Sequence, residues 1–411
     1  MSLKTRARPL AGLLALCLLA LSACTTPPPR APTTLFEQDI IEATDGLAAQ
    51  WRGKSTLRLP RPASRLALGP FVDLSGAPAR QTGAFAQPQS LAAVKARDIV
   101  RRHVETVLSD FKLVAPGPGS DAAAELLLSA SLAPFAHADG QGGGKQQLML
   151  TLVLLDIKTR AVVARWQSAL RSETSDSYPS PYESATPVLI TQSASEARAA
   201  MFSTPIESSV DAPTVGEAIG LSRLAQAQAA YTSGRYEQAL VLFQDVAARS
   251  PEQALRAYNG QYLTYMKLGR TQDAQQAFRK VVAAGLASKR LAVKLLFTPG
   301  QTEFWSEPEV SGAYGAWLTE IAAQAVAAPF CLEIAGHTSR TGAEGFNLNL
   351  SMARSERVRQ IMLRNQAALA GRLQASGKGW TENLVGSGTD DARDAVDRRV
   401  EFKVAGCKPA F

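Results

Sequence analysis

The most constraining feature of this sequence is a polar loop near its end that joins an apolar strand to a long helix. The strand is predicted at residues 331–335, a short apolar run of the kind that forms buried strands. The loop follows at residues 336–342 (Gly-His-Thr-Ser-Arg-Thr-Gly), and Asn347 or Ser351 can cap the helix after it. Arg354 then falls in the first or second helical turn. Because binding groups gather in loops held by a rigid scaffold, we expect a binding site here.

Four short motifs in this part of the chain occur in the same order in OmpA-like peptidoglycan-binding domains, which residues 293–406 resemble. They are Gly-His-Thr at 336–338, a glycine at 342 followed by Asn347, Leu-Ser-x-x-Arg at 350–354, and Arg-Arg-Val-Glu at 398–401. The resemblance implies a βαβαββ domain, here residues 291–411. Within it, strands are also predicted at 291–297, 385–388 and 399–404, and a helix is predicted at 314–327. It also implies a site that grips the zwitterionic end of diaminopimelate in the peptide stem of peptidoglycan.

The resemblance assigns peptidoglycan binding to Thr338, Ser339, Asn347, Arg354 and Arg398. Arg354 matches the family's arginine, whose guanidinium can fork onto a carboxylate. Ser339 stands where the family has aspartate, so a hydroxyl replaces the carboxylate that would hold an ammonium group. Hydrogen bonds to charged groups contribute about 1.5–3 kcal/mol, so we expect weakened peptidoglycan binding. The alternative is that the pocket is a relic and the domain packs on protein.

Residues 1–24 are a predicted lipoprotein signal peptide. Three basic residues precede an apolar run at 10–20, which is too short to span a membrane. The run ends in Leu-Ser-Ala-Cys at 21–24, which resembles a bacterial lipobox and implies a lipid on Cys24. The alternative is an ordinary signal peptide with an incidental cysteine.

The residue after the lipobox cysteine is Thr25, which in such lipoproteins implies the outer membrane, with the protein facing the periplasm. Residues 25–34 contain four prolines and are predicted to be a Pro-rich tether. Removing residues 1–23 takes away three basic and no acidic residues, so the formal charge falls from +8 to +5. Without a dense Lys/Arg run, this mild positive charge does not indicate a nucleic-acid partner.

Cys331 and Cys407 remain in the mature chain, in an oxidising compartment. Cys331 opens one predicted strand, and Cys407 follows the last one, at residues 399–404. If these strands are antiparallel neighbours, the start of one lies beside the end of the other. A disulfide would close a loop of 76 residues and contribute roughly 4 kcal/mol in the chain-entropy model. The alternative is two buried free thiols.

Residues 35–171 are predicted to form a small α/β sandwich. The order is helix, strand, helix and then a meander of three strands. It loosely resembles the small domains of penicillin-binding-protein activator and curli-secretion-type lipoproteins; the closest local match is Leu-Asp-Ile-Lys-Thr at 155–159. The strands are predicted at 66–72, 125–133, 147–157 and 161–170, and the second helix at 90–111.

Residues 172–213 are rich in Ser, Thr and Pro and are predicted to be a linker. Residues 214–290 contain a repeat of three positions at an interval of 35 residues, which resembles a pair of tetratricopeptide repeats. A generic four-helix stretch is the alternative. Two repeats are few for an independent array, so we expect them to lean on a neighbouring domain and to hold a protein partner. The repeated positions are Gly234, Ala239 and Phe243, then Gly269, Ala274 and Phe278.

The sequence contains no pattern that indicates catalysis. Its three histidines, His103, His137 and His337, lie in separate segments without metal-ligand spacing. The glycine-rich stretch at 140–144 lacks the spacing of a phosphate-binding loop and is predicted to be a hairpin tip. We therefore expect neither enzymatic activity nor a catalytic residue, cofactor or metal.

The chain is thus a predicted multidomain α/β protein with a helical repeat pair in the middle and an OmpA-like domain at the end. Its predicted function is that of an outer-membrane lipoprotein that binds or is positioned at peptidoglycan through its OmpA-like domain and scaffolds envelope proteins. The alternative is a periplasmic regulator that activates a wall-synthesis or secretion machine through its N-terminal domain.

Overall fold

The computed structural model divides the chain into two units, residues 1–34 and 35–411. Of the first unit it describes Thr34 alone, so the predicted signal peptide, Cys24 and the rest of the Pro-rich tether lie outside the described residues. No helix among the described residues is long and apolar enough to cross a membrane. The described residues are 34–53, 62–74, 90–114, 124–135, 147–171, 182, 185–189, 201–289, 291–298, 300–383, 388, 394 and 397–407.

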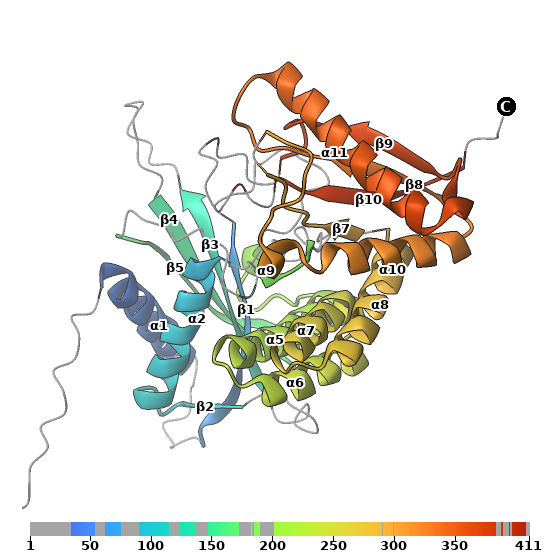
Figure 1. Cartoon of the computed structure of the whole chain (residues 1–411). Helices are drawn as coiled ribbons and strands as arrows, with labels where there is room; N and C mark the ends of the chain where they lie inside the picture. Colours follow the sequence, from blue (N-terminus) through green and yellow to red (C-terminus); the bar gives the residue numbers. More distant parts are fainter. Residues whose placement is uncertain are drawn as a thin grey trace, which may run out of the picture. The chain divides into compact units, whose positions relative to one another are not determined.

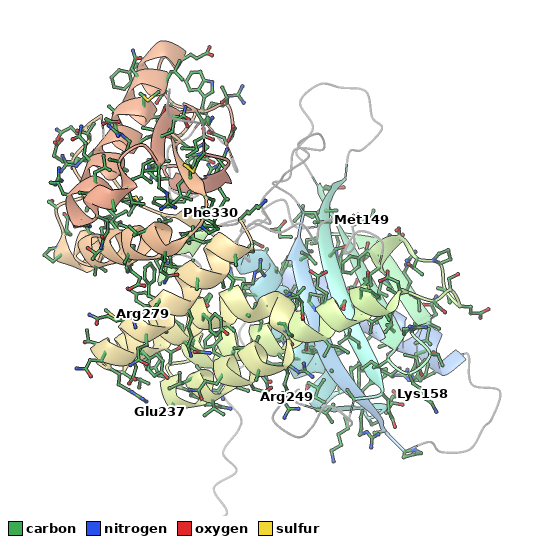
Figure 2. All side chains as sticks on the ribbon, turned by 90° about the vertical axis from the view of Figure 1, so that its right-hand side faces the viewer. Met149, Lys158, Glu237, Arg249, Arg279 and Phe330 are labelled. Carbon is green, nitrogen blue, oxygen red and sulfur yellow. A yellow bond between two sulfur atoms is a disulfide. The ribbon has the colours of Figure 1, made fainter. Side chains whose placement is uncertain are left out.

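The N-terminal domain is built on a five-stranded sheet with the order β2-β1-β3-β4-β5. β1 runs parallel to β2 and β3, whereas β3, β4 and β5 form the predicted antiparallel meander. Met149 lies near the start of β4, and Lys158 lies in the turn that follows this strand (Figure 2). The strands are β1 (Ser64–Asp73), β2 (Phe111–Leu113), β3 (Leu126–Phe135), β4 (Gln147–Asp156) and β5 (Val162–Ala169).

Helices cover both faces of this sheet. On one face, α1 (Leu35–Gly53) and α2 (Leu91–Thr106) pack in a core with alternate strand residues (Figure 1). The other face packs against α5 (Ala212–Thr232), where Ser222 Oγ donates a hydrogen bond to the carbonyl of Leu68. Because both faces are buried, β1 and β4 are nearly continuous apolar runs instead of alternating ones.

Four helices in the middle of the chain form two successive hairpins. Gly234 and Gly269 occupy the two turns with φ of +73° and +70°, a conformation that glycine adopts without strain. The alanine and phenylalanine of each repeat are buried, so the 35-residue interval gives two equivalent helix pairs. The helices are α5, α6 (Tyr236–Arg249), α7 (Ala254–Lys267), which follows the short helix η1 (Pro251–Gln253), and α8 (Thr271–Ala287).

The C-terminal domain contains a second five-stranded sheet, with the order β6-β7-β10-β8-β9. β10 is antiparallel to β7 and β8, and β8 is parallel to β9. From β7 onward the order of strands and main helices is βαβαββ, so the predicted multidomain α/β fold is confirmed. The strands are β6 (Val188–Leu189), β7 (Leu291–Val293), β8 (Cys331–Gly336), β9 (Leu373–Gly377) and β10 (Val400–Ala405), and the helices are α9 (Pro308–Ser311), α10 (Tyr314–Ala327), α11 (Glu344–Asn365) and η2 (Ala367–Leu369).

Some elements of the C-terminal sheet differ from the prediction. The strand predicted at 291–297 ends at Val293, and the strand before β10 is β9. Of the strand predicted at 385–388, only Gly388 is described, and it is a bend. The predicted linker also contributes to the fold, since β6 pairs with β7 and Phe202 is buried against the N-terminal sheet.

The helix pairs and the C-terminal domain share one apolar core. Trp317 of α10 stacks on Phe278 of α8 with ring centroids 5.6 Å apart, and its Nε1 donates a hydrogen bond to Tyr262 Oη at 3.0 Å. At the edge of this contact, Gln324 Nε2 donates to the carbonyl of Arg279 at 2.8 Å. The second helix pair is therefore packed on the C-terminal domain.

The predicted disulfide between Cys331 and Cys407 is confirmed, with a Cα–Cα distance of 4.9 Å. β8 and β10 are antiparallel neighbours, and Ala405 near the end of β10 pairs with Cys331 at the start of β8. The bridge thus fastens the end of the chain to the first residue of the strand that leads to the polar loop.

Candidate functional site

The candidate site begins where β8 packs tightly against α11. A Cβ on Gly336, the last residue of β8, would lie 2.3 Å from the carbonyl oxygen of Ser351. Gly377 of β9 is equally close to α11, because a Cβ there would lie 2.6 Å from the backbone nitrogen of Met352. These glycines let the helix backbone approach the sheet and fix where the loop leaves it.

Thr338 and Ser339 lie at the start of the loop and are both buried, with 2% and 6% of their surface exposed. The backbone nitrogen of Thr338 donates to the carbonyl of Gly379 at 2.9 Å. Its Oγ1 is buried and has no hydrogen-bond partner within the described part of the chain. Ser339 Oγ lies 3.3 Å from Thr341 Oγ1 and shares a hydrogen bond with it. The loop therefore presents neutral hydroxyl groups where the family motif has a carboxylate.

Asn347 holds the loop instead of capping the helix. α11 begins at Glu344, so the predicted caps at Asn347 and Ser351 are wrong. The Asn347 amide donates to the carbonyls of Thr341 and Ala343, at 2.8 and 3.1 Å. Ser351 Oγ in turn accepts a hydrogen bond from the backbone nitrogen of Gly379 at 2.9 Å. Both polar groups fasten neighbouring loops to the helix.

Arg354 lies in the third turn of α11, one turn later than predicted, because the helix begins before Asn347. Only 4% of its surface is exposed. Its Nε donates to the carbonyl of Gln301 at 3.0 Å and its Nη2 to that of Thr298 at 3.2 Å. The guanidinium also lies 4.8 Å from the centre of the Phe297 ring. Arg354 is thus a buried cation whose orientation is fixed by the turn after β7.

Arg398 lies in the segment that leads into β10 and is partly buried, next to the fully buried Arg399. Together with the loop and Arg354, this accounts for all five residues that the sequence assigned to peptidoglycan. The structure joins Asn347 directly to the loop through its amide and ties Arg354 to the turn 298–301.

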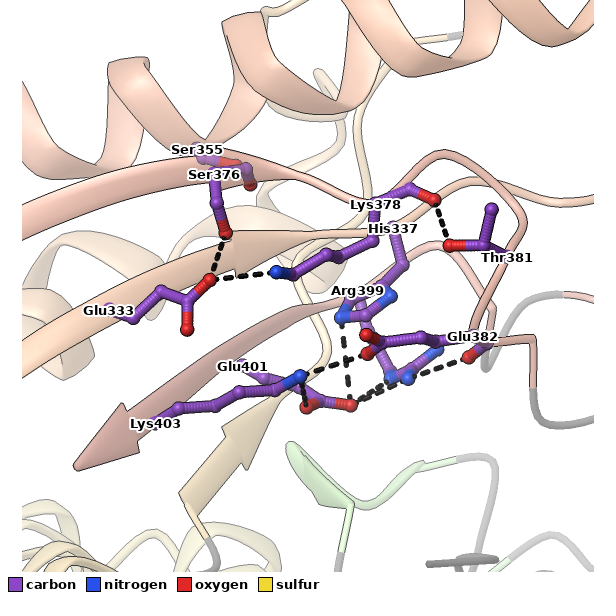
Figure 3. Close-up of polar contacts among 10 residues, drawn as sticks. All are labelled: Glu333, His337, Ser355, Ser376, Lys378, Thr381, Glu382, Arg399, Glu401 and Lys403. Carbon is purple, nitrogen blue, oxygen red and sulfur yellow. Dashed lines mark hydrogen bonds and ion pairs between the residues drawn. The ribbon is translucent and has the colours of Figure 1, made fainter. Parts of the chain in front are cut away.

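A partly buried network of charges lies on the face of β10 and was not predicted from the sequence (Figure 3). Arg399 Nε donates to Glu401 Oε1 at 2.7 Å, and Lys403 Nζ lies 2.8 Å from Glu382 Oε2. His337 Nε2 lies 3.6 Å from Glu401 Oε1. Residues 399, 401 and 403 alternate along the strand and so face one side. This period-two pattern of charges was the signal that could have predicted the network.

Burial, followed by the positive charges of Arg399, Lys403 and Lys378, lowers the pKa of His337 from 6.5 to about 2. The imidazole is therefore neutral at physiological pH. For Lys403, burial lowers the pKa, but the hydrogen bond with Glu382 and the carboxylate of Glu401 outweigh it, so the pKa is raised.

His337, Glu382 and Glu401 bring ligand atoms of the types that metals prefer within 4.8 Å of one another. Each of the two carboxylates already pairs with a cation: Glu401 with Arg399, and Glu382 with Lys403. These side chains supply the positive charge that a metal ion would bring. We therefore describe the cluster as an ion-pair network that supports the strand entering the loop.

Residues 296–397 match the family model described as the OmpA family, in agreement with the motifs and the βαβαββ order. They form an OmpA-like domain at the C-terminal end of the chain. Over 73 residues the chain is 37% identical to outer membrane porin F from Pseudomonas fluorescens. This matched stretch is 18% of this chain and 22% of that protein. The chain therefore matches less than a quarter of the length of that curated relative.

Two solved structures are similar to parts of the chain. The peptidoglycan-associated lipoprotein from Burkholderia pseudomallei is 23% identical, over 27% of this chain and 88% of that one, with a TM-score of 0.23. The cell wall anchor of the T6SS from Pseudomonas aeruginosa is 20% identical, over 30% and 94% of the two chains, with a TM-score of 0.24. Because these scores are low, the domain assignment depends on the family match and the motif residues.

Proposed function

We propose that this protein is an outer-membrane lipoprotein, tethered through Cys24, whose OmpA-like domain binds peptidoglycan in the periplasm. The observation that carries the proposal is the connection from β8 to α11, which holds Thr338, Ser339 and Arg354 at the motif positions of a domain that matches the OmpA family. Arg354 supplies a fixed positive charge for a stem-peptide carboxylate, which must approach the guanidinium away from the carbonyls of 298 and 301.

Ser339 sets the strength of this binding. Its hydroxyl offers a neutral hydrogen bond, so the ammonium of diaminopimelate lacks the charged partner that an aspartate would give. Sedimentation with purified sacculi tests the site with the full chain, as wild type, Ser339→Asp and Ser339→Ala. We expect weak sedimentation of the wild type and about tenfold tighter binding of Ser339→Asp, since roughly 1.4 kcal/mol corresponds to a factor of ten.

Ser339→Ala is the matched control, because it changes the same position without adding charge. It should bind no better than the wild type. The peptidoglycan proposal fails if the wild type does not sediment and Ser339→Asp does not restore binding. Arg354→Ala is a less direct probe, because the side chain also fastens the turn 298–301. Its loss of binding counts only if circular dichroism and the melting temperature are preserved.

The two helix pairs, which resemble tetratricopeptide repeats, are proposed to hold a protein partner, and the chain is proposed to be a non-enzymatic scaffold. Val241 of α6 and Met266 of α7 expose 52% and 47% of their surface, so a change at Val241 would disturb a partner on these helices without altering the buried core. Capture from a solubilised envelope fraction with the wild type and with Val241→Asp tests this. A partner lost from the variant supports scaffolding through the helices. A wall synthase or secretion protein captured equally by both would favour the regulator that acts through the N-terminal domain.

A further inference from the structure

A cavity of about 780 Å³ lies between α2 of the N-terminal domain and the first helix pair, α5 and α6. This volume falls in the range of small-molecule sites, roughly 300–1,000 Å³. Part of its wall is apolar: Leu91, Val94 and Leu113 line it and are only partly buried. Covering the exposed surface of these side chains with an apolar group of a ligand is favourable, because it removes apolar surface from water.

Arg97 of α2 brings an unneutralised positive charge to the cavity wall. Its Nε is buried and has no hydrogen-bond partner among the described residues, and none of their carboxylates lies within ion-pair distance of its guanidinium. Burial, reinforced by the like charge of Arg101, lowers the pKa of Arg97 to about 10 despite the opposing charge of Asp98. A partly buried cation without a partner is unfavourable, and an anion in the cavity reduces that cost.

The two neighbouring arginines of α2 differ from Arg97 in this respect. Arg101 pairs with Asp98 and Glu105, each at 2.7 Å, and Arg102 pairs with Asp98 at 3.1 Å. Asp98 and Glu105 also line the cavity, and both are already paired, Asp98 with Arg101 and Arg102 and Glu105 with Arg101. Arg235 also lines the cavity but is exposed, so the described lining holds three arginines and two carboxylates and has a formal charge of +1. This arrangement suits a monoanion better than a doubly charged phosphate.

Gln226 of α5 supplies the complementary polar group. It lines the same cavity, and its buried Oε1 has no donor within the described part of the chain. A ligand that forms hydrogen bonds with both polar groups must therefore carry an anionic acceptor for Arg97 and an N–H or O–H donor for Gln226. The apolar side chains call for an aliphatic body between or beside these groups.

We propose that this cavity binds a small N-acylated, aliphatic amino acid or dipeptide, with its carboxylate on Arg97 and an amide N–H directed to Gln226 Oε1. The planar guanidinium matches a carboxylate with two parallel hydrogen bonds. Leu91, Val94 and Leu113 receive the aliphatic side chain. The site is separate from the OmpA-like loop, so it stands or falls independently of peptidoglycan binding.

Calorimetric titration of the full chain with N-acetyl-leucyl-leucine tests the proposal, with its C-terminal amide as the matched probe. The acid should bind at least tenfold more tightly than the amide. Arg97→Met should remove this preference, and Gln226→Met should weaken the acid. Arg102→Met is the control variant, because it removes an arginine from the same helix that does not line the cavity. It should bind like the wild type.

A second readout separates a binding role for Arg97 from a structural one. If the role of Arg97 is to bind an anion, its positive charge does not stabilise the ligand-free protein. In the absence of the probe, Arg97→Met should therefore melt at the wild-type temperature or above it, because an unpaired, partly buried charge has been removed. Three outcomes would each overturn the proposal. They are equal binding of the acid and the amide, no binding of the acid, and a melting temperature of Arg97→Met clearly below that of the wild type. Dodecanoate has a carboxylate and an aliphatic chain but no amide. If it binds the wild type as tightly as N-acetyl-leucyl-leucine does, and binds Gln226→Met equally well, the proposed amide contact with Gln226 is wrong.

Discussion

Mild acid should destabilise the C-terminal domain through His337. The side chain is buried, and its pKa in the folded protein is about 2, against 6.5 for the free group. At a pH between about 2 and 6.5, this group therefore binds a proton in the unfolded state and not in the native state. Stability from this group is complete above the unfolded pKa and falls as the pH decreases toward the folded pKa.

The size of the effect follows from one proton. Each pH unit below the unfolded pKa costs about 1.4 kcal/mol, so going from about pH 7.5 to about pH 5 should remove roughly 2 kcal/mol of unfolding free energy. In the C-terminal domain, the described carboxylates whose pKa is lowered, Glu333 and Glu356, start from an ordinary value of 4.5 and contribute mainly at lower pH. The interval between about pH 5 and about pH 7 thus isolates histidine.

Urea titrations at these pH values should be made on the wild type, His337→Gln and His103→Gln. His337→Gln should lose most of the pH dependence, whereas His103→Gln, in the N-terminal domain, should keep that of the C-terminal domain. The measured quantity is the slope of the unfolding free energy against pH. A loss of stability that is the same at every pH does not change this slope. The reasoning fails if His337→Gln and the wild type show the same slope.

Three further predictions concern the anchor, the disulfide and the packing of the loop. A tagged fatty acid should label the wild type and not Cys24→Ser; equal labelling would exclude the lipid anchor. Reduction of the Cys331–Cys407 bridge should lower stability by roughly 4 kcal/mol, as its 76-residue loop implies, and unchanged urea unfolding would contradict this. Gly336→Ala should cost about 1–3 kcal/mol, because its Cβ would meet a backbone oxygen of α11 at 2.3 Å. Gly315→Ala, which has open space in α10, is the control and should be neutral or slightly stabilising.

The elements that the sequence predicted well have strong local patterns. The helix predicted at 314–327 has the bounds of α10, and the apolar runs of the N-terminal meander became β3, β4 and β5. β9 was missed because its sequence, Leu-Gln-Ala-Ser-Gly, is short and weakly apolar and only its first residue is buried. β6 was missed because two residues inside a Ser/Thr/Pro-rich segment carry no period of their own.

In the candidate site, too, the sequence predicted the local features but not the contacts between distant side chains and backbone groups. The loop and its residue types followed from the motifs, but the start of α11 did not, because the Asn347 amide holds the loop instead of capping the helix. The burial of Arg354 depends on carbonyls more than 50 residues earlier in the chain, at 298 and 301. Long-range contacts of this kind leave no local signal in the sequence.

The shared core has a consequence for how wall binding and partner binding combine. Phe278 and Tyr262 of the second helix pair hold Trp317 of the C-terminal domain by stacking and by a hydrogen bond. Close-packed interiors transmit strain and deform little. A C-terminal domain bound to peptidoglycan would therefore carry α7 and α8 with it, and a partner on these helices would be held at a fixed distance from the wall. Separate fragments 36–290 and 293–411 would each expose half of this core, so partner assays need the intact chain.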